Sequence, residues 1–164
     1  MRKLINNLRS FFYTNLAKYS MRDFKSDIKA NGFTWLTRRT SLGNNVNFNG
    51  FRIYGTGKVS IGNNFHSGFG CKILNSYHNY DGESIPYDSS VIVKDVTIQD
   101  NVWLGINVLI LGDVTIEEGA IIQAGSVVVN NIPKYAIAGG HPAKVFSYRN
   151  KVKYEKLKQE GKFF

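Results

Sequence analysis

Residues 92–132 decide the fold, and they read IVKDVTIQDNVWLGINVLILGDVTIEEGAIIQAGSVVVNNI. An apolar side chain recurs at every sixth position of this stretch without a slip: Ile92, Ile98, Leu104, Ile110, Ile116, Ile122 and Val128. Four residues after each of these stands a second small or apolar side chain: Val96, Val102, Val108, Val114, Ala120, Ser126 and Ile132. A period of six matches neither a helix, at about 3.6 residues per turn, nor an ordinary strand, at about two. The stretch therefore predicts a repeat structure with a six-residue unit.

The third residue after each position of the first series is always Asn, Asp or Gly: Asp95, Asn101, Asn107, Asp113, Gly119, Gly125 and Asn131. These residue types tolerate a positive φ angle, so each unit is predicted to be a short strand followed by a tight corner. Three units make a triangular coil of about 18 residues, and stacked coils pair as parallel strands around the apolar side chains. We therefore predict a mainly β fold, a parallel β-helix. The alternative is a β-sandwich, but a sandwich has no reason to keep one turn chemistry at one interval.

The same pattern occurs earlier in the chain, in residues 42–46 (LGNNV) and 61–65 (IGNNF). Their spacing of 19 residues implies a one-residue insertion, which we place around residues 55–57. The period disappears in residues 76–90, SYHNYDGESIPYDSS, so this segment is predicted to leave the β-helix as an extended loop. The β-helix is assigned to residues 32–141.

The two ends of the chain have helical patterns. Residues 1–31 carry apolar side chains at helical spacing among Lys and Arg: Leu4, Ile5, Leu8, Phe11, Phe12, Leu16 and Tyr19. We predict a helical segment that caps the open first coil; the alternative is a basic amphipathic helix in peripheral contact with an anionic membrane. Residues 142–164, which contain VFSYRNKVKYEKLKQEGKF, are predicted to form a C-terminal helix on an outer face.

Composition narrows the function classes. The 164 residues carry a formal charge of +9, which favours an anionic partner such as a nucleotide cofactor, a phosphorylated substrate or a membrane surface. A single cysteine, Cys71, excludes an internal disulfide framework and a multi-cysteine zinc site, and it fits a reducing cytoplasm. No apolar run approaches the roughly 20 residues that span a bilayer, and the N-terminal segment does not resemble a signal peptide. Nucleic-acid binding is not favoured, because no aromatic and basic recognition motif accompanies the charge.

From residue 40 to residue 150 the chain resembles the hexapeptide-repeat acetyltransferases. The most specific stretch is VTIQDNVWLGINVLILGDVTIEEGAIIQAGSVVVNNIPKYAIAGGHPAKV, with a Trp-containing coil, an AGSVV coil and a GxPAK exit. The resemblance implies a left-handed β-helix, acetyl-CoA as co-substrate, and a homotrimer with the cofactor groove between adjacent subunits. Two departures stand out: Asn130-Asn131 replaces the family's frequent Lys-Asp, and Ile106 replaces a small or polar residue.

Acetyl transfer to a hydroxyl needs a base, and neutral imidazole suits that role near pH 7. His78 lies in the aperiodic loop, 25 positions before Trp103, and matches the family's catalytic histidine. Without the resemblance it reads as a solvated loop histidine. His66 is interpreted as a surface residue, with contact to the acceptor or a neighbouring subunit as the alternative, and His141 as a residue that shapes the exit from the β-helix or borders CoA. The three histidines do not have the spacing of the zinc-binding β-helical carbonic anhydrases, so no metal is expected.

The resemblance also implies a cofactor site. The thioester oxyanion needs fixed N–H donors, and the Ile106 amide is the candidate. Small residues would let the extended pantetheine arm lie along a groove, and cations would meet the CoA phosphates. The residues expected to bind acetyl-CoA are Trp103, Gly105, Ala124, Gly125, Ser126, Lys144 and Arg149. Each also has a structural explanation, as a packing residue, a corner residue or a solvated charge.

The aperiodic loop offers aromatic faces and hydrogen-bonding groups of the kind that hold sugars. The residues expected to bind the acceptor are Tyr77, Asn79, Tyr80, Asp81, Glu83 and Tyr87, with Asp88 beside them. Asp81 or Glu83 is the expected partner that orients His78, and the alternative is that both are solvated. Cys71 is expected to be a buried structural thiol rather than a nucleophile.

These observations predict an acetyl-CoA-dependent O-acetyltransferase acting on a sugar or glycan hydroxyl, in bacterial surface-polysaccharide biosynthesis. The alternatives are an N-acetyltransferase acting on an amino sugar, free or nucleotide-linked, and a xenobiotic acetyltransferase. A non-enzymatic alternative is a β-helix binding scaffold.

Overall fold

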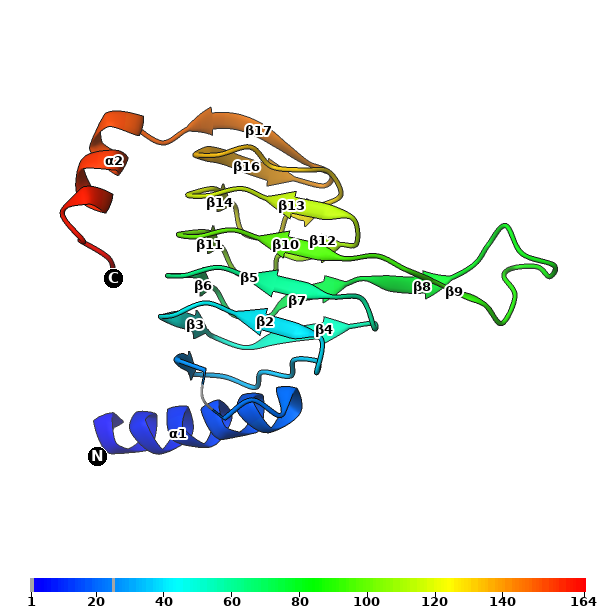
Figure 1. The fold of residues 1–164 in the computed structure, drawn as a ribbon, viewed down its shortest axis with the longest axis horizontal. Coiled ribbons are helices and arrows are strands. Elements are labelled where there is room, and N and C mark those ends of the chain that lie inside the picture. The colour runs from blue at the N-terminus through cyan, green and yellow to red at the C-terminus, as the bar shows by residue number, and fades with distance from the viewer. Residues whose placement is uncertain (1, 25) are drawn as a thin grey trace.

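The computed structural model describes residues 2–24 and 26–164, and it is a parallel β-helix of about six turns between two helices (Figure 1). The predicted fold class is confirmed. Helix α1 spans Arg2–Met21 and helix α2 spans Lys151–Gln159. The strands are β1 (Ile28–Ala30), β2 (Thr40–Leu42), β3 (Val46–Phe48), β4 (Phe51–Tyr54), β5 (Val59–Ile61), β6 (His66–Ser67), β7 (Cys71–Leu74), β8 (Ser76–His78), β9 (Val91–Val93), β10 (Val96–Ile98), β11 (Trp103–Leu104), β12 (Leu109–Leu111), β13 (Val114–Ile116), β14 (Ile121–Ile122), β15 (Val127–Val128), β16 (Ala136–Gly140) and β17 (Ala143–Tyr148).

The β-helix has three faces, each a stack of parallel strands. Face A contains β1, β3, β6, β11, β14 and β16, with β17 added antiparallel at its end. Face B contains β4, β7, β12 and β15, and face C contains β2, β5, β10 and β13. Val96 pairs with Val114, an offset of 18 residues, which is the predicted coil length. The three edges between the faces are named the A–B, B–C and C–A corners below.

The six-residue series fills the interior. Its members from Ile98 to Val128 are at most 1% exposed, and the second series from Val96 to Ile132 is at most 2% exposed. The first coils add three buried rings, Phe48, Phe51 and Phe65, whose centroids lie 5.2–6.0 Å apart. Ile92 is the exception, because it lies in β9, outside the stacked coils.

The corners use the residues that the sequence indicated. Asn101, Asn107, Asp113, Gly119 and Gly125 all have φ between 54° and 73°. Asp95 and Asn131 were predicted to be equivalent, but they are not among the positive-φ residues. Their carboxylate and amide oxygens instead accept hydrogen bonds of 2.7 Å from backbone N–H groups of adjacent coils. These two corners are therefore held by side chains rather than by a left-handed backbone.

A hairpin leaves the B–C corner where the sequence loses its period. Val59 pairs with Val96, an offset of 37 residues instead of 18, and the inserted residues contain antiparallel β8 and β9. Figure 1 shows this hairpin projecting far from the stacked coils, on the side opposite α2. Gly57 lies at its base, where a Cβ atom would stand 1.9 Å from the Lys94 carbonyl oxygen. The insertion near residues 55–57 thus lies under the hairpin.

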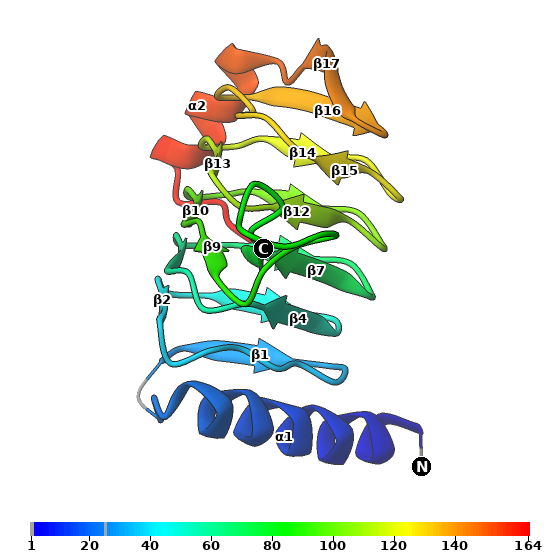
Figure 2. The same cartoon turned by 90° about the vertical axis from the view of Figure 1, so that its right-hand side faces the viewer.

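Helix α1 lies across the open end of the stack, next to β1 (Figure 2). The Ala30 amide donates to the Thr14 hydroxyl and the Leu36 amide donates to the Ser20 hydroxyl, at 2.9 and 3.0 Å. Ala17 and Met21 are buried. In contrast, most of the predicted apolar positions are 57–72% exposed: Leu4, Ile5, Leu8, Phe11, Phe12 and Tyr19. The helix caps the first coil, but with its small residues rather than with its large apolar ones.

The C-terminal segment differs from the prediction in its first part. Residues 143–148 form β17, which pairs antiparallel with β16, so the helix begins at Lys151. The Asn150 side chain caps it by accepting a hydrogen bond from the Lys153 amide. Helix α2 then packs at the C–A corner, where a Cβ at Gly119 would lie 2.9 Å from the Tyr154 ring.

Candidate active site

His78 is the last residue of β8, where it pairs with Val91 of β9. Its exposed imidazole stacks on the Tyr87 ring, with centroids 4.1 Å apart and planes inclined by 12°. Tyr77 and Tyr80 form a second stack at 6.4 Å. Stacking holds the imidazole by its face and leaves its edge, which carries both nitrogens, accessible. His78 is thus oriented and open to a partner in solution.

The acidic residue whose pKa is influenced by the charge of His78 is Asp88. Its carboxylate accepts hydrogen bonds from the Ser90 amide at 2.8 Å and the Glu83 amide at 3.2 Å. Hydrogen bonds from Ser90 are the main reason that the pKa of Asp88 is lowered, and the charge of His78 acts in the same direction. Asp81 and Glu83 were the predicted partners, but neither side chain has a hydrogen bond to His78 within the described residues.

A second part of the site is the A–B corner, where Gly105, Ile106, Ala124 and Gly125 stack. The Gly125 amide donates to the Ile106 carbonyl oxygen at 2.8 Å. A Cβ at Gly125 would have no atom within 4 Å, and Ile106 is 53% exposed. Within the described chain the Ile106 N–H has no hydrogen-bond acceptor. This corner therefore presents a row of small residues, named the small-residue track below, beside an amide that has no hydrogen-bond acceptor within the described chain.

Gly68 belongs to this corner, although sequence reasoning did not single it out. A Cβ at Gly68 would stand 2.6 Å from the Ile106 nitrogen and 2.7 Å from the Gly105 carbonyl carbon. Any side chain at this position would cover the candidate amide. The signal in the sequence was the spacing, because Gly68 pairs one coil below Gly105.

Three of the predicted cofactor residues, Ser126, Trp103 and Arg149, do not lie on this track. Ser126 is fully buried, and its hydroxyl donates to the Gln123 carbonyl and accepts from the Gly140 amide. Its side chain is thus part of the core. Lys144 is exposed and pairs with Gly139 near the A–B corner. Arg149 lies at the other end of β17, near the C–A corner, where its amide donates a hydrogen bond to the Tyr135 carbonyl. Five extended residues span about 17 Å, so one ligand group cannot contact both cations.

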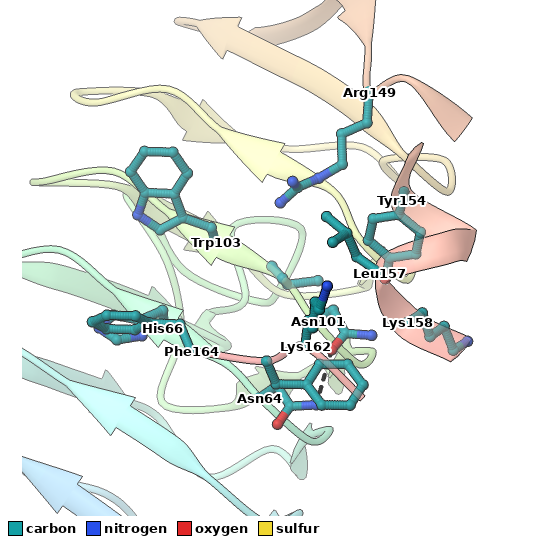
Figure 3. Close-up of a pocket in the computed structure, with 12 residues that line it drawn as sticks. Asn64, His66, Asn101, Trp103, Arg149, Tyr154, Leu157, Lys158, Lys162 and Phe164 are labelled. Carbon is teal, nitrogen blue, oxygen red and sulfur yellow. Dashed lines mark hydrogen bonds between the residues drawn. The ribbon is translucent and has the colours of Figure 1, made fainter. Parts of the chain in front are cut away.

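Trp103 and Arg149 meet instead in a cavity of about 440 Å³ between face A and the C-terminal segment (Figure 3). Trp103 is 51% exposed and forms part of the wall with His66. The remaining lining residues are Asn64, Asn101, Val102, Tyr154, Leu157, Lys158, Lys162, Phe163 and Phe164. Burial and the nearby charge of Lys29 lower the pKa of His66, so its ring is neutral at pH 7.

The cavity keeps its shape because α2 is tied to the β-helix through Glu118. This carboxylate forms ion pairs with Lys134, at 3.0 Å, and with Lys158, and it accepts a hydrogen bond from the Tyr154 hydroxyl at 3.1 Å. Burial would raise the pKa of Glu118, but hydrogen bonds from Lys158, Lys134 and Tyr154 outweigh burial and lower it. The anchored helix forms one wall of the cavity.

One chain keeps these three parts of the site separate. His78 projects from the B–C corner, the small-residue track follows the A–B corner, and the cavity lies towards the C–A corner. Figure 1 shows the hairpin and α2 on opposite sides of the stack. The single chain therefore does not bring His78 to Ile106 or Trp103.

Other candidate groups are excluded by their surroundings. Burial raises the pKa of Cys71 to about 11, and its thiol donates to the Gly105 carbonyl at 3.0 Å, so a nucleophilic thiolate is disfavoured. His141 is exposed beside the exit strand. Within residues 2–24 and 26–164, no group of three or more His, Cys, Asp or Glu side chains is arranged to hold a metal ion. No helix in these ranges is long and apolar enough to cross a membrane.

Comparison with known proteins shows which proteins this chain is similar to. Residues 95–130 match the family model described as bacterial transferase hexapeptide (six repeats). A Schizosaccharomyces pombe protein whose name assigns it to the acetyltransferases is 39% identical over 87 residues, which cover 52% of this chain and 41% of the relative. The galactoside O-acetyltransferase of Escherichia coli is 30% identical over 111 residues, covering 56% of this chain and 54% of that enzyme. The chain thus spans about half the length of these relatives or less.

A solved structure has the same fold. Galactoside acetyltransferase in complex with coenzyme A superimposes with a TM-score of 0.65 at 22% identity, covering 90% of this chain and 84% of that one. The repeat, the fold and the relatives together make this chain similar to the hexapeptide-repeat acetyltransferases.

Proposed function

We propose that this chain is an acetyl-CoA-dependent O-acetyltransferase that acts on a sugar or glycan hydroxyl. The observation that carries the proposal is the A–B corner, where the free Ile106 amide lies beside a track of small residues. The likeness to the hexapeptide-repeat acetyltransferases and the galactoside O-acetyltransferase relative support the acetyl donor and the sugar class of acceptor. Surface-polysaccharide biosynthesis is the corresponding pathway class.

Three groups of this chain have roles in the reaction. His78 removes the proton from the acceptor hydroxyl as its oxygen attacks the thioester carbon. The Ile106 N–H donates a hydrogen bond to the carbonyl oxygen as it becomes negative. The imidazolium then returns the proton to the departing thiolate, so no acetyl-enzyme is formed. Acetyl-CoA supplies the activated acetyl group when bound.

The residues present fit an extended pantetheine arm. Ala124 and Gly125 are exposed and have small side chains or none. The space beside the Gly125 Cα is open, and a larger residue at this position would occupy it. Lys144 lies at the same corner, where it would pair with a CoA phosphate. Ile106 is larger than the usual family residue, so its backbone amide rather than its side chain serves the acetyl group. Ala124→Phe would block the track and is expected to abolish acetyl-CoA binding.

We propose a homotrimer in which His78 of one subunit faces the A–B corner of its neighbour, because one chain holds these parts apart. The test mixes two inactive variants, His78→Ala and Ala124→Phe, after dissociation and reassembly. Mixed trimers place an intact hairpin opposite an intact corner at about a quarter of the interfaces, so about a quarter of the activity should return. Failure to regain activity in verified mixed trimers contradicts the shared site.

The acceptor atom is decided by product analysis. Acetyl ester formation on a hydroxyl supports the proposal, whereas an amide product on an amino sugar assigns the chain to N-acetylation. Turnover of an antibiotic alone would favour the xenobiotic alternative. If the chain does not bind acetyl-CoA with any of the acceptors present, the outcome assigns it to the binding-scaffold alternative.

Helix α1 carries a surface suited to an anionic membrane. At about 100° per residue, Leu4, Leu8 and Phe11 lie on the side of the helix opposite Ala17, which packs on the first coil. Lys18 lies next to this stripe, Lys3 and Arg9 are exposed on other sides of the helix, and α1 contains no acidic residue. We propose that α1 lies in the interface of an anionic bilayer, where three parallel copies in a trimer would bind together.

Co-sedimentation with vesicles tests this contact. The wild-type chain should pellet with phosphatidylglycerol-containing vesicles and remain in solution with pure phosphatidylcholine. Phe11→Ser with Phe12→Ser should lose pelleting, whereas Val152→Ser, which removes an 81% exposed apolar residue from α2, should not. Equal pelleting of all three proteins contradicts the assignment to α1.

A further inference from the structure

The cavity between face A and α2 has a chemistry that selects its ligand. Its lining includes three cationic residues, Arg149, Lys158 and Lys162, and no Asp or Glu. Lys158 is paired with Glu118, and Lys162 with Glu160 at 2.7 Å. Among the described residues, no carboxylate lies within ion-pair distance of Arg149. Arg149 is therefore the one lining cation whose charge has no acidic partner in that part of the chain.

The Arg149 guanidinium is positioned before any ligand arrives. Its Nε donates to the Gly119 carbonyl at 2.6 Å, and its central carbon lies 5.6 Å from the centroid of the Tyr154 ring. These contacts leave the terminal nitrogens directed to the cavity, on the same side as Trp103 (Figure 3). Burial lowers the pKa of this half-buried cation, in keeping with a charge that an anion would compensate. A guanidinium with two free N–H groups suits a phosphate or carboxylate.

The opposite wall suits a ring. Trp103 presents a half-exposed indole, and the His66 and Phe164 rings lie with centroids 5.4 Å apart. Neutral His66 both donates and accepts hydrogen bonds, as a sugar hydroxyl requires. Aromatic faces and a few polar groups are the usual lining of a site for a sugar or a nucleoside.

The cavity is also close to the proposed reaction centre. Trp103 lies on face A and Ile106 three residues later at the A–B corner, so at most about 11 Å of chain separates them. A sugar on Trp103 can therefore direct a hydroxyl to the A–B corner while a charged substituent remains at Arg149. We infer that this cavity binds an acceptor sugar that carries a phosphate or carboxylate, with the ring on Trp103 and the anion on Arg149. This inference rests on the proposed acetyltransferase function for its reaction, but not for its binding site.

Fluorescence titration measures the binding directly. Trp35→Phe leaves Trp103 as the sole tryptophan, since the chain has two. Saturable quenching is expected with glucose 1-phosphate, UDP-glucose or glucuronate, and much weaker quenching with methyl glucoside. The preferred anion among the three identifies a phosphate, a nucleoside diphosphate or a carboxylate. Equal binding of methyl glucoside overturns the inference.

Variants of Arg149 locate the anion. Arg149→Gln should weaken binding of the preferred anionic sugar by about tenfold or more, and Arg149→Lys by less, because charge persists without the planar fork. Lys153→Gln removes one exposed charge from α2 outside the cavity and should leave affinity unchanged. Hydrogen exchange of α2 shows whether Arg149→Gln has merely released the helix. Unchanged affinity in Arg149→Gln, with α2 still protected, overturns the inference.

Release of free CoA separates this inference from the proposed function. Acetylation of anionic sugars with a KM raised by Arg149→Gln supports both. Turnover of neutral glycans in preference to anionic ones leaves the function standing and overturns the role of the cavity. Binding of anionic sugars at Trp103 without CoA release from any acceptor contradicts the proposed function and leaves the binding site standing.

Discussion

The stacked coils and the inserted hairpin hold their side chains in opposite ways. In the coils, Ile98, Ile110 and Ile116 are at most 1% exposed, and most corners carry an Asn, Asp or Gly at positive φ. In the hairpin, Tyr80 is 65% exposed and Ile85 is 97% exposed. The coils supply the buried apolar area that stabilises the fold, whereas the hairpin contributes little to that area. Stability therefore rests on the coils, whereas the proposed general base, His78, lies in the hairpin, and substitutions should separate the two.

His78→Ala is the largest expected effect on activity. Removing a general base slows acetyl transfer by about 10²- to 10⁴-fold, while thermal unfolding stays unchanged because the imidazole is exposed. Release of free CoA and a melting curve measure the two quantities on the same sample. Ile85→Ala, in the same hairpin, is the control for a general disturbance of the loop. A large fall in melting temperature for His78→Ala contradicts the separation.

Ile110→Ala tests the other side of the comparison. Truncating a fully buried isoleucine should lower the free energy of unfolding by about 2–5 kcal/mol, because a cavity remains between the coils. Ile92 occupies the same place in the six-residue series, but it lies in β9 and is only partly buried. Ile92→Ala should therefore cost much less, about 1 kcal/mol. Chemical denaturation of both variants gives the comparison, and equal losses would show that the hairpin is part of the core.

The regular coils could be predicted from sequence because each unit repeats one requirement. Every sixth side chain must be buried, and each corner needs a residue that tolerates a positive φ. Together these two requirements allow only one arrangement of the chain. The repeat also carried information that the site prediction did not use. Ser126 occupies the inward position four residues after Ile122, so its burial followed from the same series that indicated the fold.

The ends and the site could not be predicted in the same way. Helical spacing in α1 indicated an amphipathic helix, but it could not show that Ala17, rather than Phe11, contacts the first coil. Residues 143–148 lack a six-residue repeat, and only the free edge of β16 explains why they form a strand. Arg149 and Trp103 are 46 residues apart in the chain, and both line the cavity because Arg149 is held beside face A by its hydrogen bonds to the Tyr135 and Gly119 carbonyls.

Gly68→Ala sharpens the comparison within the coils, because it changes a site residue that belongs to the stacked region. The new Cβ would stand 2.6 Å from the Ile106 nitrogen, so it both strains the stack and covers the amide. We expect a loss of about 1–3 kcal/mol in stability and a tenfold or larger loss in kcat among folded molecules. Acetyl-CoA titration and kcat measured below the melting transition separate these effects. Full kcat in this variant removes Ile106 from the mechanism.

Glu118→Gln has the smallest expected effect and concerns the anchoring of α2. Because hydrogen bonds from Lys158, Lys134 and Tyr154 lower the pKa of Glu118, its ionised form stabilises the fold above the ordinary glutamate pKa of about 4.3. That contribution is lost as the pH falls through the lowered value. The melting temperature of Glu118→Gln should thus lie below the wild-type value at pH 7, and the difference should shrink towards zero below about pH 4. Hydrogen exchange at pH 7 should locate the loss in α2, at about tenfold lower protection. The control is Glu83→Gln, which changes an exposed hairpin residue and should show no such difference in melting temperature at either pH. A melting-temperature difference for Glu118→Gln that stays constant across the pH range would mean that the shape of the side chain, rather than its charge, anchors the helix.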